Sequence, residues 1–368
     1  MSQPTGTFEQ ARQFFLDGLA HYQAGRMDAA ERSFAASLAL VPGRPSTLTN
    51  LGAARLKLGR SDEAVVVLRE AVAAEPANAE AWGHLAAGLA ELGRRDEALE
   101  AVSKAVQLQP ASGAAWMLRA TLQREGGFAE DARHSYREAL AHGADPALVQ
   151  FALGALEQQP VAAPPRHYVE QLFDSYAEGF DEHLVHGLQY RGPELLCEGL
   201  ARARYGSALD LGCGTGLAAP LLRSRCDRLA GVDVSAVMVE RARARGLYDE
   251  VQQADLVDAL LAAPNAHDLL FAADVFIYVG ALEGVFAAAA GALRAGGEFC
   301  FSVEAADGEH DWELRTSLRY AHAEGYIRML AGQHGFAVRR LSRHPLRIDQ
   351  GQPVEGLFAW LDRPGHTV

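Results

Sequence analysis

The sequence predicts a two-domain chain, in which a stack of α-helical hairpins precedes an α/β domain with a mostly parallel sheet. Before residue 157, proline, glycine and apolar positions recur with a period of 34 residues. After residue 166, short apolar strand patterns alternate with helical patterns. The proline-rich segment 158–165 separates the two patterns and is typical of a linker. We therefore expect a repeat domain over 1–157 and an α/β domain over 166–368.

Composition excludes several classes of function. The formal net charge of −13 argues against a nucleic-acid substrate, because phosphates require a basic face. No apolar run reaches the roughly 18 residues that a membrane span needs, and the first residues lack the pattern of a signal peptide. The four cysteines form no C-x-x-C pair, which predicts neither a disulfide framework nor a metal site. We expect a cytoplasmic protein.

The repeats follow the rules of a helix hairpin. Pro42, Pro76 and Pro110 lie 34 residues apart and begin successive units. Within each unit a small residue marks the helix crossing, a glycine marks the turn, and a large residue fills the space opposite. In chain order, the large residues are Phe34, Leu68, Val102 and Tyr136, and the turn glycines are Gly25, Gly59, Gly93 and Gly127. The pattern resembles four tetratricopeptide repeats (TPRs) over residues 11–146, closed by a capping helix near 147–157.

A stack of such repeats offers a concave groove that can bind a protein partner. By the spacing of the repeat, this groove is lined by small and apolar residues such as Tyr22, Thr49, Ala53 and Met117. It lacks the basic clamp of chaperone-binding repeats. Self-association or packing on the second domain therefore remains an equal alternative, and the oligomeric state is left open.

The second domain is organised around residues 209–216, LDLGCGTG. A short apolar strand pattern ends at Leu211, and an apolar helix pattern begins at Leu217. Glycines at 212, 214 and 216 allow a sharp turn and the close approach of a ligand to the backbone. The spacing lacks the G-x-G-x-x-G form of dinucleotide-binding loops. The segment predicts a nucleotide-type cofactor loop of another kind.

Two acidic residues indicate which cofactor fits. Asp233 ends the next strand pattern, where a carboxylate can accept hydrogen bonds from both hydroxyls of an adenosine ribose. Asp210 lies two residues before the first glycine, where it would repel the pyrophosphate of a dinucleotide. The same carboxylate suits a cationic amino-acid ligand.

With these residues, LDLGCGTG followed by GVDVS resembles the class I S-adenosylmethionine (SAM)-dependent methyltransferases. Together with the repeats, nearly the whole chain resembles bacterial TPR-containing methyltransferases. The resemblance implies a Rossmann-like, seven-stranded sheet with SAM as cofactor. The residues implied to bind it are Asp210, Gly212, Cys213, Gly214, Gly216, Asp233, Val234, Met238, Asp255, Leu256, Asp274 and Tyr176. Asp255 is expected at the adenine amino group, with a helix N-cap as the competing or simultaneous role.

The remaining strands and a lid are predicted from the same patterns. We expect strands at 207–211, 229–234, 252–256, 267–279, 296–304, 335–341 and 355–361. The aromatic and acidic stretch 173–184 resembles the segment that covers the cofactor in related enzymes. It makes Tyr176, Phe180 and His183 lid candidates, although an ordinary packing helix is as good an interpretation of each.

Methyl transfer is an in-line displacement, in which the acceptor atom attacks the methyl carbon. A base is therefore needed only when the acceptor atom starts protonated. Asp274, Glu304 and His322 follow strands or open a helix at the substrate side. We expect His322 to open the helix before the sixth predicted strand. His322 and Glu304 are the candidate catalytic residues, and histidine suits the role because its ordinary pKa lies near neutrality.

The sequence thus predicts an enzyme that transfers a methyl group from SAM. The exit of the fourth strand, Ala273-Asp274-Val275-Phe276, differs from the N-P-P-Y loop of amide- or adenine-modifying relatives. This difference favours an oxygen, nitrogen or carbon atom of a small molecule as the acceptor. A protein acceptor held by the repeat groove, or a repeat scaffold with a non-catalytic SAM-binding domain, are the alternatives.

Overall fold

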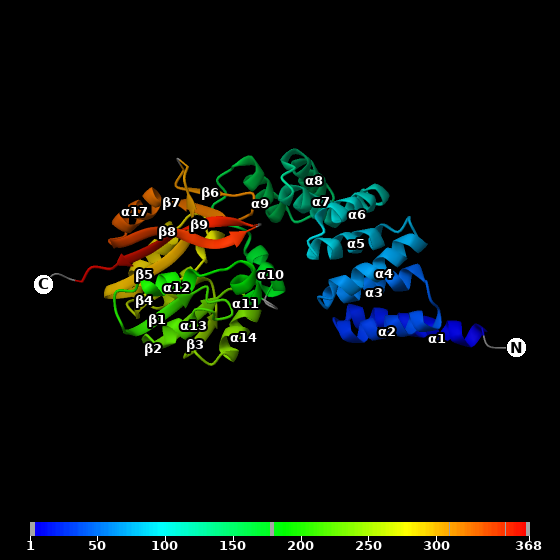
Figure 1. Cartoon of the computed structure of the whole chain (residues 1–368), viewed down its shortest axis with the longest axis horizontal. Helices are drawn as coiled ribbons and strands as arrows, with labels where there is room; N and C mark the ends of the chain where they lie inside the picture. Colours follow the sequence, from blue (N-terminus) through cyan, green and yellow to red (C-terminus); the bar gives the residue numbers. More distant parts are fainter. Residues whose placement is uncertain (1–3, 177–179, 309, 350, 366–368) are drawn as a thin grey trace. The chain divides into compact units, whose positions relative to one another are not determined.

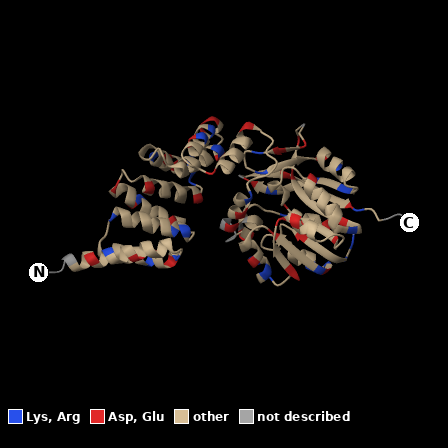
Figure 2. Cartoon of the chain, turned by 180° about the vertical axis from the view of Figure 1, so that it is seen from behind, with Lys and Arg blue, Asp and Glu red and all other residues tan. Residues whose placement is uncertain are grey.

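The computed structural model describes residues 4–176, 180–308, 310–349 and 351–365. The chain divides into two compact units, one reaching to Leu156 and the other beginning at Glu157 (Figure 1). The first unit is all helix, and the second has a sheet with helices around it. Acidic and basic residues are interspersed along both units (Figure 2). No helix in the described part of the chain is long and apolar enough to cross a membrane.

The first unit consists of four helix hairpins and a ninth helix. The helices are α1 (Pro4–Gln23), α2 (Met27–Leu40), α3 (Pro45–Lys57), α4 (Ser61–Ala74), α5 (Ala79–Glu91), α6 (Arg95–Leu108), α7 (Gly113–Glu125), α8 (Ala129–Ala141) and α9 (Pro146–Glu157). Each turn inside a hairpin contains a glycine with φ between 70° and 79°, a conformation that side chains other than glycine's disfavour. These are the four turn glycines that the repeat pattern predicts.

Close helix crossings explain the small residues of the repeat. A Cβ atom added to Gly18 would lie 2.5 Å from the Phe34 ring, and one added to Gly52 would lie 2.4 Å from Leu68. Both large side chains are fully buried. The small and large positions therefore interlock, and any larger residue at Gly18 or Gly52 would force the two helices of its hairpin apart.

The second unit is built on one mixed sheet. Its strands are β1 (Tyr205–Leu211), β2 (Cys226–Asp233), β3 (Glu250–Gln253), β4 (His267–Ala272), β5 (Leu293–Ala306), β6 (Trp312–Leu314), β7 (Tyr320–Ala323), β8 (Ala337–Asp349) and β9 (Gln352–Asp362). The path β3-β2-β1-β4-β5 is parallel, and β9 runs antiparallel to β5 with β8 beyond it. The predicted strands are all present, while β6 and β7 were not expected.

Helices and short turns surround this sheet. They are α10 (Arg166–Tyr176), α11 (Phe180–Glu182), the π-helical turn η1 (His183–Gly187), α12 (Gly192–Glu198), α13 (Ala219–Arg223), α14 (Ala236–Ala244), α15 (Leu256–Ala262), the 3₁₀ turn η2 (Phe276–Tyr278), α16 (Glu283–Ala292) and α17 (Glu324–Gln333). Phenylalanines of η2, α16 and β5 form the centre of the core, where the Phe299 and Phe301 ring centroids lie 4.8 Å apart. The core fixes the strand ends that carry the site.

The location of His322 corrects the sequence analysis. The expectation that His322 opens a helix is wrong, because it lies in β7 and α17 begins only at Glu324. Tyr320 and His322 alternate with two alanines, which gives the period of two that a strand requires. Since β9 occupies one edge of β5, β7 shares the other edge with β4 and lies beyond the end of β4.

The proline-rich segment expected as a linker is bound to the second unit. The Val161 carbonyl accepts a hydrogen bond of 2.7 Å from the Tyr320 hydroxyl. The Ala162 carbonyl accepts from the backbone N–H groups of Gly280 and Ala281 at 3.1 and 3.2 Å. Residues 161 and 162 are therefore held against the loop that follows β4. We propose that the linker proper is the short stretch before them.

Candidate active site

The glycine loop after β1 has the backbone that a cofactor loop requires. Gly212, Gly214 and Gly216 have φ values of 61°, 54° and 86°. A Cβ on Gly212 would collide with Val275 at 2.6 Å, so only glycine fits there. A Cβ on Gly214 would have only one neighbour within 4 Å, the Phe180 ring at 3.7 Å. The backbone at Gly214 is therefore approachable, and Phe180 lies over it.

Asp233, at the end of β2, ties this loop to the next one. One carboxylate oxygen accepts from the Gly214 N–H at 2.8 Å, and the other accepts from the Ser235 N–H at 2.9 Å. Burial raises the pKa of Asp233, while these N–H donors oppose the rise. The carboxylate is thus placed beside the glycine loop by the backbone of two separate segments.

Asp210, near the end of β1, is buried and lies close to Asp233. Its carboxylate accepts a hydrogen bond of 2.6 Å from the Tyr248 hydroxyl. Burial raises the pKa of Asp210 to about 7, and the charge of Asp233 adds to this effect. Within the described residues no basic side chain forms an ion pair with either carboxylate. Two buried acids without a cationic partner favour a cationic ligand.

The segment before β1 is fastened across the loop by polar contacts. Asp174 of α10 accepts from the Ser235 hydroxyl at 2.6 Å. Asp181 of α11 accepts from the Thr215 hydroxyl and pairs with Arg245. These contacts hold α10 and α11 at the cofactor loop, as a lid would be held.

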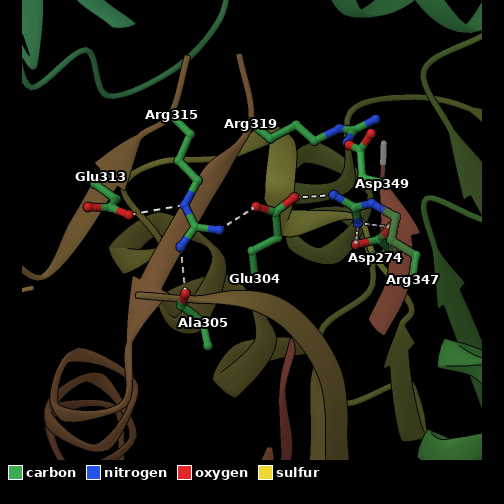
Figure 3. Close-up of polar contacts among 8 residues, drawn as sticks. All are labelled: Asp274, Glu304, Ala305, Glu313, Arg315, Arg319, Arg347 and Asp349. Atoms are coloured by element: carbon green, nitrogen blue, oxygen red, sulfur yellow. Dashed lines mark hydrogen bonds and ion pairs between the residues drawn. The ribbon is translucent and has the colours of Figure 1, made fainter. Parts of the chain in front are cut away.

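An ion-pair network lies at the carboxyl ends of β4 and β5, the edge where open α/β sheets bind ligands (Figure 3). Arg347 of β8 donates to both oxygens of Asp274, at 3.1 and 2.9 Å, and pairs through its other terminal nitrogen with Glu304. Arg315 reaches Glu304 from the opposite side at 2.9 Å. Arg319 lies beside them and pairs with Asp349 at 2.8 Å. We call Asp274, Glu304, Arg315, Arg319 and Arg347 the edge network.

Burial and the neighbouring charges act in opposite directions on the pKa values of Arg347 and Asp274. Burial alone lowers the pKa of Arg347, but Asp274 and Glu304 outweigh it and leave the pKa raised. Burial raises the pKa of Asp274, and Arg347 opposes that rise. Arg347 and Glu304 are almost fully buried, so moving either one would leave the charge of the other unpaired.

Two regions of the chain match models of known protein families. Residues 209–301 match the family model described as a methyltransferase domain. Residues 21–89 and 55–122 match the model described as a tetratricopeptide repeat. This chain carries tetratricopeptide repeats followed by a methyltransferase domain.

Individual relatives share part of the chain. The human methyltransferase-like protein 27 is 32% identical over 44% of this chain and 57% of its own length. A malonyl-[acyl-carrier protein] O-methyltransferase from Enterobacter lignolyticus is 28% identical over 49% of this chain and 74% of its own length. The putative methyltransferase in a complex with the Haloferax volcanii Trm112 activator has a TM-score of 0.43 and 19% identity, covering 52% of this chain and 97% of that one. The chain thus spans little more than half the length of its human relative.

The other expected cofactor residues of the methyltransferase domain lie around the same strand ends. Asp255 caps α15, accepting from the N–H groups of Val257 and Asp258 at 2.8 and 3.4 Å. Both of these bonds use one carboxylate oxygen, so the cap and an adenine contact are compatible. Leu256 begins α15. The Val234 carbonyl accepts a hydrogen bond from the side-chain amide of Gln253, the last residue of β3. Met238 is fully buried in α14, which is the position of a core residue.

The side chain of Tyr176, at the end of α10, lies outside the described residues, as does that of His183. Cys213 is buried in the glycine loop, and its N–H donates to the Val232 carbonyl at 2.9 Å. No group of three or more potential metal ligands is present among the residues that the structure describes.

The two candidate catalytic residues do not share a surface. In the register of β5 and β7, Glu304 pairs with Ala321 and Ala305 pairs with His322. Because side chains alternate between faces of a sheet, Glu304 and His322 point to opposite faces. His322 is fully buried, and its Nε2 donates toward the carbonyls of Val279 and Gly280 at 3.0 and 2.9 Å. Burial lowers its pKa to about 4.

The sequence analysis missed the basic half of the site. Arg315 and Arg319 lie between β6 and β7 and Arg347 lies in β8, far along the chain from the glycine loop, and they reach the strand ends only because these strands add to the sheet. Asp174 and Asp181 belong to the stretch 173–184 that was predicted as a lid, but their contacts with Ser235, Thr215 and Arg245 were not predicted. No motif marks these residues. The only available signals were two arginines just before β7 and the several arginines of β8, which do not differ from surface residues in the sequence.

Proposed function

We propose that this chain is an active SAM-dependent methyltransferase that methylates a small molecule, with SAM bound at the glycine loop. The observation that carries the proposal is the pair of buried carboxylates, Asp210 and Asp233, beside the approachable backbone of Gly214. SAM brings a cationic sulfonium and a cationic ammonium group to this acidic pocket. An NAD pyrophosphate would instead bring negative charge to it.

Each residue has a defined part in holding SAM. Asp233 accepts from the ribose hydroxyls, since the N–H groups that it already binds fix its orientation. Asp210 takes the ammonium group, and Asp255 takes the adenine amino group with the oxygen that does not cap α15. Gly212, Cys213, Gly214 and Gly216 provide the turn, Val234 and Leu256 flank the adenine, and Met238, Tyr176 and Asp274 complete the surroundings.

The domain's own residues supply positioning rather than proton transfer. Glu304 is held between two arginines, and His322 is bound to two carbonyls on the other face of the sheet. We propose that His322 is a positioning residue, which fixes the loop after β4. Methyl transfer then proceeds by alignment of an acceptor atom with the methyl group and the sulfur.

The acceptor and the repeats complete the proposal. The buried ion pair of Arg347 and Glu304 at the ends of β4 and β5 fits a small molecule better than a protein segment (Figure 3). The name of the Enterobacter relative, an O-methyltransferase, favours an oxygen acceptor. We propose that the TPR unit binds a protein partner, since such repeats stack into an extended binding surface.

Titration calorimetry with SAM, S-adenosylhomocysteine and NAD tests the cofactor assignment. Asp233→Asn should weaken SAM binding about 100-fold, because a hydrogen bond to a charged group contributes about 1.5–3 kcal/mol and the ribose makes two. Asp227→Asn is the control, since Asp227 lies on the same strand but pairs with Arg204 at the surface. NAD binding more tightly than SAM, or normal SAM binding by Asp233→Asn, would contradict the proposal.

A further inference from the structure

Two buried hydrogen-bond donors near the edge network have no partner among the described residues. They are the Tyr190 hydroxyl and the Nε atom of Arg347. Tyr190 is 6% exposed and Arg347 is 2% exposed. Leaving a buried donor unpaired costs about 1–3 kcal/mol, so each of these donors requires a partner, either a ligand or an ordered water.

The two donors are brought together by the backbone. Tyr190 follows the π-helical turn η1, and its N–H donates to the Leu184 carbonyl at 3.0 Å. Two residues before it, the Leu188 carbonyl accepts a hydrogen bond of 2.7 Å from the N–H of Ile348, the residue after Arg347. The segment that carries Tyr190 therefore runs alongside the end of β8.

Tyr190 packs in one hydrophobic cluster with Ala208 of β1, two residues before Asp210, and with Leu346 of β8, the residue before Arg347. Burial raises the pKa of Tyr190. Asp210 belongs to the proposed SAM pocket, whereas Asp274 and Arg347 belong to the edge network. An acceptor that bound to Tyr190 and Arg347 would therefore lie next to the methyl donor.

The donors select the chemistry of the acceptor. A guanidinium N–H and a phenol O–H both donate, so they fit a group with only accepting oxygens, such as a carboxylate. The terminal nitrogens of Arg347 are occupied by Asp274 and Glu304, which leaves Nε as the free donor. The charges of Arg315, Arg319 and Arg347 are matched by the carboxylates of Asp274, Glu304 and Asp349, so the Nε hydrogen-bond donor rather than a surplus charge is what the site offers to the acceptor.

The two candidate bases that the structure describes, Glu304 and His322, are both unavailable to an acceptor at Tyr190 and Arg347, which agrees with this selection. Glu304 is fixed by Arg315 and Arg347, and His322 points to the other face of the sheet. A carboxylic acid is already ionised at neutral pH, so its oxygen attacks without losing a proton. An alcohol or an ammonium group would need a base.

We propose that the acceptor is a small carboxylic acid, bound as a carboxylate by Tyr190 and Arg347 and converted to its methyl ester. This inference rests on the proposed methyltransferase function. A carboxylate oxygen forms a bond to the methyl carbon, the carbon–sulfur bond breaks, and its electron pair stays on sulfur. The negative carboxylate and the positive sulfonium yield a neutral ester and a neutral thioether, and no proton is transferred.

The test uses SAM labelled in its methyl group, with the low-molecular-mass fraction of a bacterial extract as the acceptor source. The same fraction with its carboxyl groups converted to amides serves as the matched sample. The proposal predicts label that base treatment releases as methanol, the signature of a methyl ester, and no such label from the amide sample. Base-stable label would overturn the carboxylate proposal and leave the methyltransferase function standing. Bound SAM without any transfer would contradict both.

Tyr190→Phe tests the site itself, because it removes only a hydroxyl that has no partner. We expect kcat/KM for the base-labile product to fall about 10-fold or more, with SAM affinity unchanged and thermal stability unchanged or higher. Tyr205→Phe is the control, since its hydroxyl donates to Glu298 at the opposite end of the sheet. That variant should lose stability but keep its kcat/KM. Equal kcat/KM in Tyr190→Phe and wild type would overturn the assignment. Arg347→Lys provides a second variant, because lysine keeps the charge but has no Nε, and its kcat/KM should fall as well.

Discussion

Replacing Asp210 with asparagine should stabilise the methyltransferase domain, and by more as the pH rises. The pKa of Asp210 is raised from 3.8 to about 7. Between pH 3.8 and about pH 7, Asp210 keeps its proton in the folded chain but has released it in the unfolded chain. The free energy of unfolding therefore falls by up to about 1.4 kcal/mol for each pH unit. Above pH 7 the ionised carboxylate therefore destabilises the fold by about 4 kcal/mol, an effect that Asp210→Asn does not have.

The assay compares urea unfolding of wild type and Asp210→Asn from about pH 5 to about pH 8. The unfolding transition of the methyltransferase domain is identified as the one that moves to higher urea concentration when SAM is added. The stability advantage of the variant should grow by about 2–3 kcal/mol across this range and level off above pH 7. Saturating SAM should stabilise wild type strongly, because its cation compensates the carboxylate, and should stabilise the variant little. A stability difference that does not change with pH would show that Asp210 is ionised throughout and refute the reasoning.

Three further variants test the rest of the account. Gly52→Ala should lower the free energy of unfolding of the repeats by about 1–3 kcal/mol through overpacking, whereas Gly83→Ala, whose new methyl group meets open space, should be neutral or stabilising in the same urea titration. Tyr320→Phe should speed proteolytic cleavage within 158–165, since it removes a hydrogen bond that holds this segment, and an unchanged rate would contradict the attachment. His322→Gln should slow methyl transfer without changing the shape of its pH–rate profile, while loss of one limb of that profile would restore His322 as a base.

Local patterns in the sequence were sufficient for most of the fold. The repeat period predicted the turn glycines because a positive φ at a helix end leaves few residue choices. The glycine loop and Asp233 were predictable because a strand end, a turn and a carboxylate follow one another at short range. The strands β6 and β7 were missed because each has at most four residues, and the alternation in β7 is too short to distinguish a strand from the start of a helix.

The acceptor side of the site depends on contacts that no local pattern encodes. Arg347 reaches Asp274 and Glu304 only because β8 is folded back through β9 onto β5. The interpretation of His322 as the start of a helix failed because pairing with β5 outweighs a weak local preference. Once β7 is a strand, alternation places His322 on the face opposite Glu304, and the sequence offered no means of seeing this.

A crystal structure with S-adenosylhomocysteine tests the central claim most directly, because it locates the cofactor atom by atom. The account predicts both ribose hydroxyls within hydrogen-bond distance of Asp233, the amino group at Asp210, and the sulfur facing Tyr190 and the edge network. A nucleotide lying elsewhere, or an adenosine bound at the loop with its amino-acid end turned away from Asp210, would contradict it.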